Sequence, residues 1–254
     1  MKNILASGNR HFLNSFLRSN VLLAFDYDGT LAPISDTPEG AAMRHTTREL
    51  LWEVTRHWPV IVISGRAQPD ALRRLRGAGV LEVVGNHGIE PWHAANRYVD
   101  EVRAWMPRLQ EALGAIPGVA IEDKIYSVAV HYRQAADKRK ALSAILEVAG
   151  ALGDVRLIRG KQVVNILSRG APHKGEALER ERARLLCDAA LYVGDDETDE
   201  DVFGYDRAQR LLAIRVGRKR GSAAGYYLPN QRAIDQLLRR ILEQRVSHGS
   251  LAHG

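Results

Sequence analysis

The chain has 254 residues, 45% of them apolar and 26% charged, so it can bury a core of its own and is neither disordered nor collagen-like. Aromatic residues make up only 6%, which argues against a surface of stacked rings that binds bases or carbohydrate. The single cysteine, Cys187, excludes an internal disulfide framework and a zinc site built from cysteines.

The basic residues exceed the acidic ones by 36 to 30, which gives a net charge of +6. They are scattered over helical patterns, with no lysine-rich tail or zinc-finger spacing. A solvated helix face explains this pattern better than nucleic-acid binding, an alternative that rests on charge alone. No apolar run approaches the ~20 residues of a membrane helix, and no apolar signal segment is present. We therefore expect a cytoplasmic protein that binds neither nucleic acid nor membrane.

Short apolar runs alternate with helical patterns in the first and last parts of the chain. The predicted strands are residues 21–25, 60–63, 81–84, 190–193 and 211–216, and the predicted helices are residues 46–57, 69–75, 174–185 and 230–244. This alternation predicts an α/β fold with a doubly wound, Rossmann-like parallel sheet and right-handed crossovers. In such a sheet, ligands bind beyond the carboxyl ends of the strands.

The middle of the chain has a different pattern, which predicts an inserted α+β module. The predicted helices there are residues 100–114 and 137–150, and the predicted strands are residues 119–122, 127–132, 155–159 and 162–167. Apolar and polar residues alternate over 127–132, which is typical of a half-exposed antiparallel sheet. Gly160 is predicted to make the turn of a hairpin between the last two strands. The resulting division is a core of 1–95 and 168–254 around a module of 96–167.

Two aspartates, Asp26 and Asp28, follow the first predicted core strand directly. Gly29 allows the chain to turn there, so that both carboxylates can converge on one pocket. A helix cap or an Asx-turn would explain one aspartate but not two. Because unpaired buried carboxylates destabilise a fold by several kcal/mol, a function is the better explanation for the pair.

Three further polar clusters lie at similar positions. Ser64, Gly65 and Arg66 follow the second core strand, and Lys174 opens a predicted helix. Either could be an ordinary cap or surface group. Six of the seven residues over 195–201 are acidic, and their mutual repulsion calls for a hard cation. Ligands that are all oxygen atoms indicate Mg²⁺.

These four clusters resemble the four motifs of the haloacid-dehalogenase-like (HAD-like) phosphotransferases. Their particular forms are similar to the trehalose-6-phosphate phosphatases: DYDGTLAPI, ISGR, GNHGIE, EDKxxSxxxHYR, GKxV, HKGEAL and GDDETDEDVF, in order from residue 22 to residue 203. The resemblance implies a HAD core with an inserted α+β cap of type C2B. It also implies Mg²⁺ as cofactor and a small sugar phosphate as substrate; we expect a monomer.

The resemblance implies a role for each core residue. Asp26 would be the nucleophile that forms an aspartyl-phosphate, and Asp28 would be the general acid and base. Ser64 and backbone N–H groups near Tyr27 and Gly65 would bind phosphoryl oxygens, and Gly65 and Arg66 are expected among the substrate-binding residues. Lys174 would neutralise charge on the transferring group.

The metal ligands implied by the resemblance are Asp26, the backbone carbonyl of Asp28, and Asp195. Asp199 would be either a direct ligand or a carboxylate that supports the ligands, with Asp196 beside it.

The cap would close over the sugar. Six residues are expected to line the substrate pocket or its hinge: His87, Glu122, Lys124, His131, Arg133 and Asn165. A purely structural role for His131 is an equal alternative. Asn165 replaces the glutamate that the family has at this position.

The leading hypothesis is thus a Mg²⁺-dependent trehalose-6-phosphate phosphatase. A phosphatase of the same architecture that acts on another sugar or glycosyl phosphate is the near alternative, because of Asn165. A signalling receiver domain also combines strand-end aspartates, a hydroxyl and a lysine in a doubly wound sheet. That class has no use for Asp28 as an acid, or for an inserted module of about 70 residues.

Overall fold

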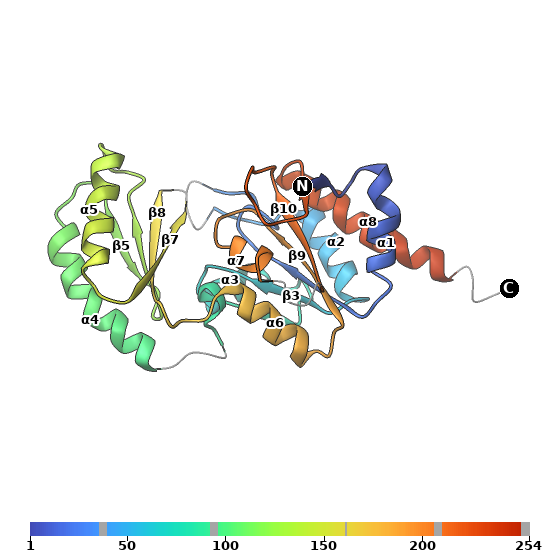
Figure 1. Cartoon of the computed structure of the whole chain (residues 1–254), viewed down its shortest axis with the longest axis horizontal. Helices are drawn as coiled ribbons and strands as arrows, with labels where there is room; N and C mark the ends of the chain where they lie inside the picture. The colour runs from blue at the N-terminus through green and yellow to red at the C-terminus, as the bar shows by residue number, and fades with distance from the viewer. Residues whose placement is uncertain (36–39, 92–95, 161, 206–209, 250–254) are drawn as a thin grey trace. The chain divides into compact units, whose positions relative to one another are not determined.

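The structure is a computed structural model that describes residues 1–35, 40–91, 96–160, 162–205 and 210–249. It divides into two compact units (Figure 1). Unit one combines Met1–Gly88 with His173–Gly254, and unit two is Ile89–Pro172. The predicted module, residues 96–167, lies within unit two.

Unit one is built on a seven-stranded parallel sheet in the order β1-β11-β10-β9-β2-β3-β4. Its strands are β1 (Lys2–Asn3), β2 (Val21–Phe25), β3 (Val60–Ile63), β4 (Glu82–Val84), β9 (Ala189–Gly194), β10 (Leu211–Val216) and β11 (Tyr226–Leu228). The chain adds β3 and β4 on one side of β2, and β10 and β11 on the far side of β9. The strand order therefore reverses between β2 and β9, where open α/β sheets bind ligands. The predicted α/β fold with a parallel sheet is confirmed.

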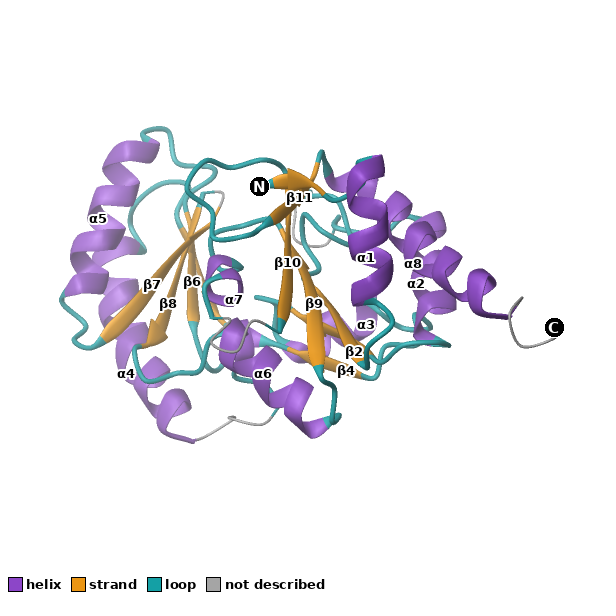
Figure 2. Cartoon of the chain, turned by 45° about the vertical axis from the view of Figure 1, so that its right-hand side comes forward, coloured by secondary structure: helices purple, strands orange, loops and turns teal. Residues whose placement is uncertain are grey.

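Helices cover both faces of this sheet. They are α1 (Arg10–Phe16), α2 (His45–Thr55), α3 (Gln68–Arg74), α6 (Lys174–Arg184), α7 (Glu200–Phe203) and α8 (Ile234–Gly249), with short 3₁₀ turns η1 (Ser7–Asn9), η2 (Asn86–Gly88) and η3 (Gln231–Ala233). Successive strand residues point to opposite faces, so Leu23 and Phe25 pack toward α1, α2, α3 and α8, whereas Leu22 and Ala24 pack toward α6 and α7. Figure 2 shows these two layers of helices.

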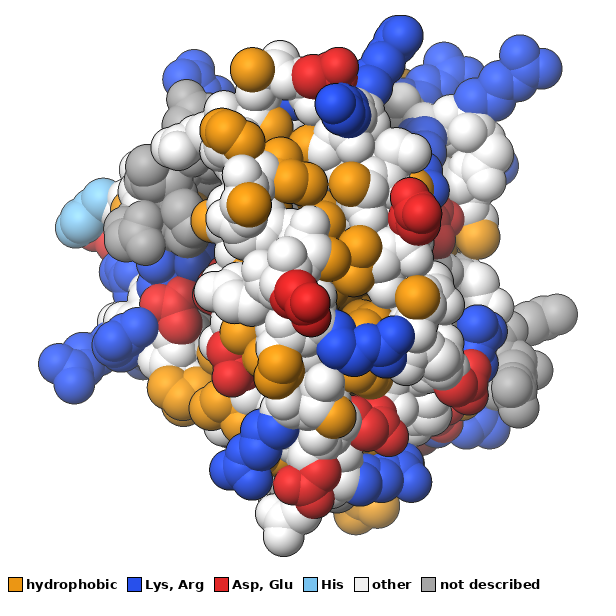
Figure 3. All heavy atoms as spheres, turned by 90° about the vertical axis from the view of Figure 1, so that its left-hand side faces the viewer, with side chains coloured by type: hydrophobic (Ala, Val, Ile, Leu, Met, Phe, Trp, Pro, Cys, Tyr) orange, Lys and Arg blue, Asp and Glu red, His pale blue; other side chains and the backbone are white. Residues whose placement is uncertain are grey.

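Unit two is a four-stranded antiparallel sheet with two helices on one face. The sheet order is β5-β6-β8-β7, with β5 (Ala120–Asp123), β6 (Val128–His131), β7 (Val155–Gly160) and β8 (Val163–Ser168). α4 (Asn96–Leu113) and α5 (Lys138–Gly150) share an apolar cluster with Val128, Val130 and Ile166. Seen from the side of α4 and α5, apolar, basic and acidic side chains are interspersed (Figure 3).

One detail of the predicted cap sheet is wrong, and a second holds only in part. Gly160 does not make the hairpin turn, because it ends β7 and pairs with Val163, and the left-handed backbone falls at Gln162 (φ 65°). Lys161 lies outside the described residues. The polar side of residues 127–132 is only partly exposed, since Ser127 and Ala129 are fully buried and the His131 side chain is 34% exposed. A second apolar cluster, which includes Leu167 and Ile158, lies on that side of the sheet.

The segment before β2, for which the sequence suggested no task, completes the sheet. β1 pairs with β11 at one edge, and Ile4 and Leu13 are fully buried in the core. The ring of Phe12 stacks on Tyr226 at 5.2 Å between centroids. Across the described residues, no helix combines the length and the apolar character needed to cross a bilayer.

Three arginines surround Asp70 in the first turn of α3. Its carboxylate accepts hydrogen bonds from Arg66 Nη1 at 2.8 Å, Arg73 Nη2 at 3.0 Å and Arg74 Nε at 3.0 Å. Arg74 also donates to the carbonyl of Ala41 at 2.9 Å, which ties α3 to the chain before α2. Burial raises the pKa of Asp70, but the hydrogen bonds from the three guanidinium groups outweigh it and hold this pKa at about 2.

We predict that Asp70 stabilises the fold in a pH-dependent way. Because its folded pKa lies below the unfolded value of 3.8, the stabilisation is present above that value and is lost as the pH falls through about 2. Asp70→Asn should lower the free energy of unfolding by about 1 kcal/mol near neutral pH, and the difference should shrink between about pH 4 and pH 2.

Urea unfolding of both proteins across this range measures the effect. Asp100→Asn is the matched control, because Asp100 has a 69% exposed side chain with one arginine, Arg103, at 3.5 Å. A difference between wild type and Asp70→Asn that does not vary with pH would contradict the prediction.

Candidate active site

The predicted core residues meet at the carboxyl ends of β2, β3 and β9. Asp26 directly follows β2 and is 4% exposed, and its N–H donates to the carbonyl of Val193 in β9 at 2.9 Å. The backbone hydrogen bonds between β2 and β9 thus continue as far as Asp26. The carboxylate of Asp26 is thereby fixed at the point where the strand order reverses.

Lys174, the first residue of α6, is buried against two carboxylates. Its Nζ donates to Asp26 Oδ1 at 2.9 Å and to Asp199 Oδ1 at 2.8 Å. Burial lowers the pKa of Lys174, but the charges of Asp199 and Asp26 outweigh it and hold this pKa well above its usual value. A cation is unfavourable at a helix N-terminus, so these carboxylates offset both the dipole and the burial.

The start of α6 is fixed independently of the lysine. His173 Nδ1 accepts the N–H groups of Gly175 at 3.1 Å and Glu176 at 3.4 Å, and the Glu176 carboxylate accepts the N–H of His173 at 3.2 Å. This reciprocal cap satisfies helix donors that would otherwise lack partners. It therefore determines where the Lys174 side chain enters the site.

Asp199 accepts four hydrogen bonds, two on each oxygen. Oδ1 accepts from Lys174 Nζ and from the hydroxyl of Tyr192 at 2.7 Å, and Oδ2 accepts the N–H of Asp195 at 2.7 Å and of Asp196 at 3.0 Å. Burial raises the pKa of Asp199, but Lys174 and these hydrogen bonds outweigh it and lower the pKa. Asp199 is therefore an ionised anchor for the loop after β9.

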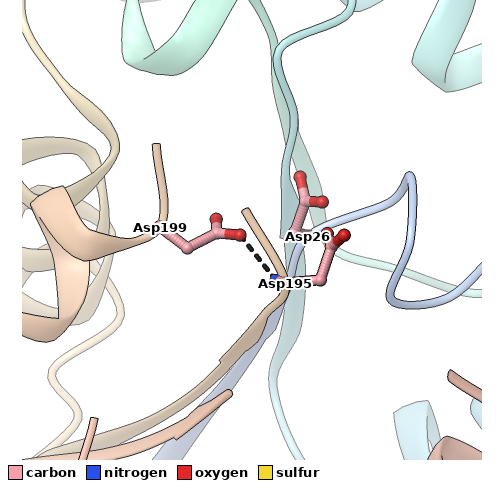
Figure 4. A group of neighbouring side chains, drawn as sticks. All are labelled: Asp26, Asp195 and Asp199. Carbon is pink, nitrogen blue, oxygen red and sulfur yellow. Dashed lines mark hydrogen bonds between the residues drawn. The ribbon is translucent and has the colours of Figure 1, made fainter. Parts of the chain in front are cut away.

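Asp195 directly follows β9 and faces Asp26 (Figure 4). One carboxylate oxygen from each of Asp26, Asp195 and Asp199 lies within 4.8 Å of the others. Burial, together with the charges of Asp199 and Asp196, raises the pKa of Asp195 to about 8. Burial also raises the pKa of Asp26 well above its usual value, against the effect of Lys174.

These residues fit a hard divalent cation. The donors are carboxylate oxygens, and three carboxylates face one ammonium. Oδ1 of Asp195 is buried and has no hydrogen-bond partner among the residues that the structure describes. Both oxygens of Asp199 are already occupied, so Asp26 and Asp195 are the carboxylates best placed to be direct ligands.

The loop that follows β2, which contains Asp28 and Gly29, packs tightly against Asp195. Gly29 has a φ of 81°, and a Cβ there would lie 2.1 Å from Oδ2 of Asp195. Only glycine allows both the backbone conformation and the close approach. Asp28, just before it, is turned to Arg66, whose Nε and Nη2 donate to its two oxygens at 2.6 Å each.

Arg66 was predicted to bind substrate, and its guanidinium donates to Asp28 and Asp70. It also lies 5.7 Å from the ring centroid of Tyr27. The two hydrogen bonds from the Arg66 guanidinium fix the orientation of Asp28, whose side chain is 38% exposed.

Ser64 and Gly65 are supported by the turn at η2. The N–H of His87 donates to the carbonyl of Ser64 at 3.0 Å, and Ser64 Oγ accepts the N–H of Arg66 at 3.2 Å. A Cβ on Gly65 would lie 2.4 Å from Cε1 of His87. The His87 ring therefore lies directly against the Gly65 backbone.

Unit two brings together three of the predicted pocket residues on one face of its sheet. Glu122, Ala129 and Asn165 form a row across β5, β6 and β8, and His131 Nε2 lies 2.8 Å from Glu122 Oε2. Oδ1 of Asn165 is buried without a hydrogen-bond partner among the described residues.

The other two predicted residues of unit two border this sheet. Lys124 follows β5 and donates its N–H to the carbonyl of Ser127 at 2.9 Å, and Arg133 lies just beyond β6.

Two residues of the site were not predicted, Tyr192 and Arg215. Arg215 is buried in β10; its Nη1 donates to the carbonyl of Asp196 at 2.8 Å and to Glu200 Oε1 at 2.9 Å, and its Nη2 donates to the carbonyl of Asp195. Burial and the charge of Asp199 hold the pKa of Tyr192 well above its usual value, so it remains a neutral donor. Each could have been found in the sequence as a polar residue within an otherwise apolar predicted strand.

Comparison with known proteins identifies the family. A sequence model described as trehalose-phosphatase matches residues 24–229. A trehalose-phosphate phosphatase of Mycolicibacterium paratuberculosis is 36% identical over 209 residues, which are 76% of this chain and 53% of the relative. Its counterpart in Mycobacterium leprae is 30% identical over 245 residues, 87% of this chain and 57% of the relative. The chain thus spans about half the length of these curated relatives.

Solved structures agree on the fold. The C-terminal domain of the Candida albicans trehalose-6-phosphate phosphatase superposes with a TM-score of 0.79 at 23% identity, covering 92% of this chain and 97% of that one. An Aspergillus fumigatus trehalose-6-phosphate phosphatase superposes with a TM-score of 0.65 at 20% identity, covering 97% of this chain and all of that one. With the strand-end aspartates, the buried lysine and the separate antiparallel sheet, these matches show that the chain belongs to the trehalose-phosphatase family of the HAD-like superfamily.

Proposed function

We propose that this chain is a Mg²⁺-dependent phosphatase that hydrolyses trehalose 6-phosphate to trehalose and inorganic phosphate. The observation that carries the proposal is the buried Asp26 carboxylate, held by Lys174 beside Asp195 and Asp199 at the switch point of the sheet. Membership of the family supports the reaction, and relatives named trehalose-phosphate phosphatase support the substrate.

The first step is the transfer of the phosphoryl group to Asp26. Lys174 holds Oδ1, so Oδ2 attacks phosphorus, and the bond from phosphorus to the sugar oxygen breaks as the acyl phosphate forms. Mg²⁺ held by Asp26, Asp195 and the backbone carbonyl of Asp28 would supply positive charge that screens the phosphoryl oxygens from the carboxylate. Lys174 neutralises the remaining charge, and Ser64 and the backbone at Gly65 bind phosphoryl oxygens.

Asp28 moves the proton in both steps. Protonated Asp28 gives its proton to the departing sugar oxygen. The resulting carboxylate then takes a proton from the water that attacks phosphorus, and the acyl phosphate breaks to restore Asp26. Arg66 pairs with the Asp28 carboxylate that the first proton transfer leaves, and it orients this carboxylate for the second transfer.

Unit two supplies the contacts to the sugar in this proposal. Glu122, Lys124 and Asn165 would hydrogen-bond sugar hydroxyls, with His131 orienting Glu122, and Arg133 is a further proposed pocket residue. Asn165, whose buried Oδ1 has no hydrogen-bond partner among the described residues, favours a second candidate, a phosphatase for a different sugar phosphate, because an amide can donate as well as accept hydrogen bonds whereas a carboxylate only accepts them.

Phosphate release from a panel of sugar phosphates and p-nitrophenyl phosphate, with Mg²⁺ and with EDTA, tests both candidates. The leading proposal expects steady turnover that EDTA abolishes and that is highest on trehalose 6-phosphate. Higher turnover of another sugar phosphate would establish the second candidate. A single turnover without continued release would indicate a receiver domain instead.

We predict that Asp26→Asn abolishes turnover in this assay. An amide is a poor nucleophile and a poor metal ligand, so the loss should be on the order of a thousandfold or more. Asp100→Asn, at an exposed site, should retain full activity. Activity of Asp26→Asn within tenfold of wild type would exclude the nucleophile role.

Asp28→Asn should slow both proton transfers and lower kcat by ~10²–10⁴-fold. Its binding of Mg²⁺, measured by calorimetry, should remain near that of wild type, because the proposed ligand is the backbone carbonyl. A collapse of metal affinity would show that the side chain binds the ion.

Asn165→Glu tests the sugar contact. Hydrogen bonds to a charged acceptor contribute roughly 1.5–3 kcal/mol against about 1 kcal/mol for a neutral one, so kcat/KM for trehalose 6-phosphate should rise by about tenfold. Gln110→Glu, on the exposed side of α4, adds the same charge as a control. Unchanged relative specificity across the panel would show that position 165 does not contact the sugar.

A further inference from the structure

The side chain of Tyr192 places a hydroxyl group in the apolar layer between the sheet and α6 and α7. It is fully buried in β9, packs in the cluster under α6 and α7, and meets the ring of Phe203 edge-on at 6.0 Å between centroids. A buried hydroxyl destabilises such a layer unless it has a partner. The partner is Oδ1 of Asp199 at 2.7 Å, so the placement of this hydroxyl is tied to one carboxylate oxygen.

That oxygen also accepts the Lys174 ammonium. Lys174 Nζ lies 2.8 Å from Asp199 Oδ1 and 2.9 Å from Asp26 Oδ1, so two of its three protons are donated to these carboxylates. The third proton can then be donated to a phosphoryl oxygen of the substrate. The position of the positive charge therefore depends on where Asp199 holds its Oδ1.

We propose that Tyr192 is a positioning residue for the phosphatase reaction, whose hydroxyl fixes Asp199 and, through it, holds the Lys174 ammonium against Asp26. The neutral Tyr192 hydroxyl suits this role, because it donates a second hydrogen bond to Asp199 Oδ1 without repelling the Lys174 ammonium. Without it, the ammonium can move toward Asp199 and away from the reacting group. The inference rests on the proposed function, because it assigns Tyr192 a part in the same reaction.

Tyr192→Phe keeps the ring and removes the hydroxyl. With p-nitrophenyl phosphate and Mg²⁺, kcat should fall roughly tenfold or more while KM changes less than about twofold, because the lost contact acts on the charge at the reacting group. Phe203→Leu disturbs the same ring contact without touching a hydrogen bond, and it should lower the melting temperature with little effect on kcat.

A double-mutant cycle with Lys174→Ala identifies the route of the effect. If Tyr192 acts through the ammonium, Tyr192→Phe should cause no further loss in the Lys174→Ala background. Equal losses in both backgrounds, or a Tyr192→Phe kcat within twofold of wild type, would overturn the inference. The aryl phosphate has no sugar, so failure of wild type on trehalose 6-phosphate alone would contradict the proposed substrate and leave this comparison intact. Absence of turnover on every substrate would overturn both.

Discussion

A buried ammonium shared by two buried carboxylates is the interaction on which the active end of unit one depends. The side chains of Lys174, Asp26 and Asp199 are at most 6% exposed, and each charge would strongly destabilise the fold if it lost its partner. The same contacts join the end of β2 to the starts of α6 and α7. The three charges therefore tie the carboxyl ends of the strands to the two helices that follow them.

The carboxylates are held by backbone and arginine contacts on both sides. Asp195 lies against the backbone of Gly29, and a Cβ on Gly194 would lie 2.2 Å from Cγ of Asp199. Arg66 fixes Asp28 on one side, and Arg215 binds the carbonyls of the loop after β9 on the other. A preorganised set of this kind needs little rearrangement when charge develops on a phosphoryl group. Burial, together with the charges of Asp199 and Asp196, raises the pKa of Asp195, and this excess of negative charge also favours a divalent cation.

The chemistry and the proposed sugar contacts lie in different units. The acidic cluster and Lys174 belong entirely to unit one, whereas Glu122, His131 and Asn165 belong to the sheet of unit two. Under the proposed function, substitutions in that sheet would alter the choice of substrate without changing the residues of unit one. Asn165, in the middle of β8, is the residue of that sheet on which the choice between the two proposed substrates depends.

The sequence by itself determined the parallel sheet, its order of elements and the strand-end positions of the core residues, because apolar runs and the residues that follow them are local features. It did not reveal β1 and β11, because both residues of β1 are polar and β11 is two half-buried tyrosines and a leucine, so that neither makes a buried apolar run like that of β2. Nor did it give the partners of the charged groups. Arg66 turns to Asp28, and Tyr192 to Asp199, because the folded backbone brings those atoms within 2.7 Å. Only the tertiary structure decides such pairings, because a buried polar group must take whichever partner packing places beside it.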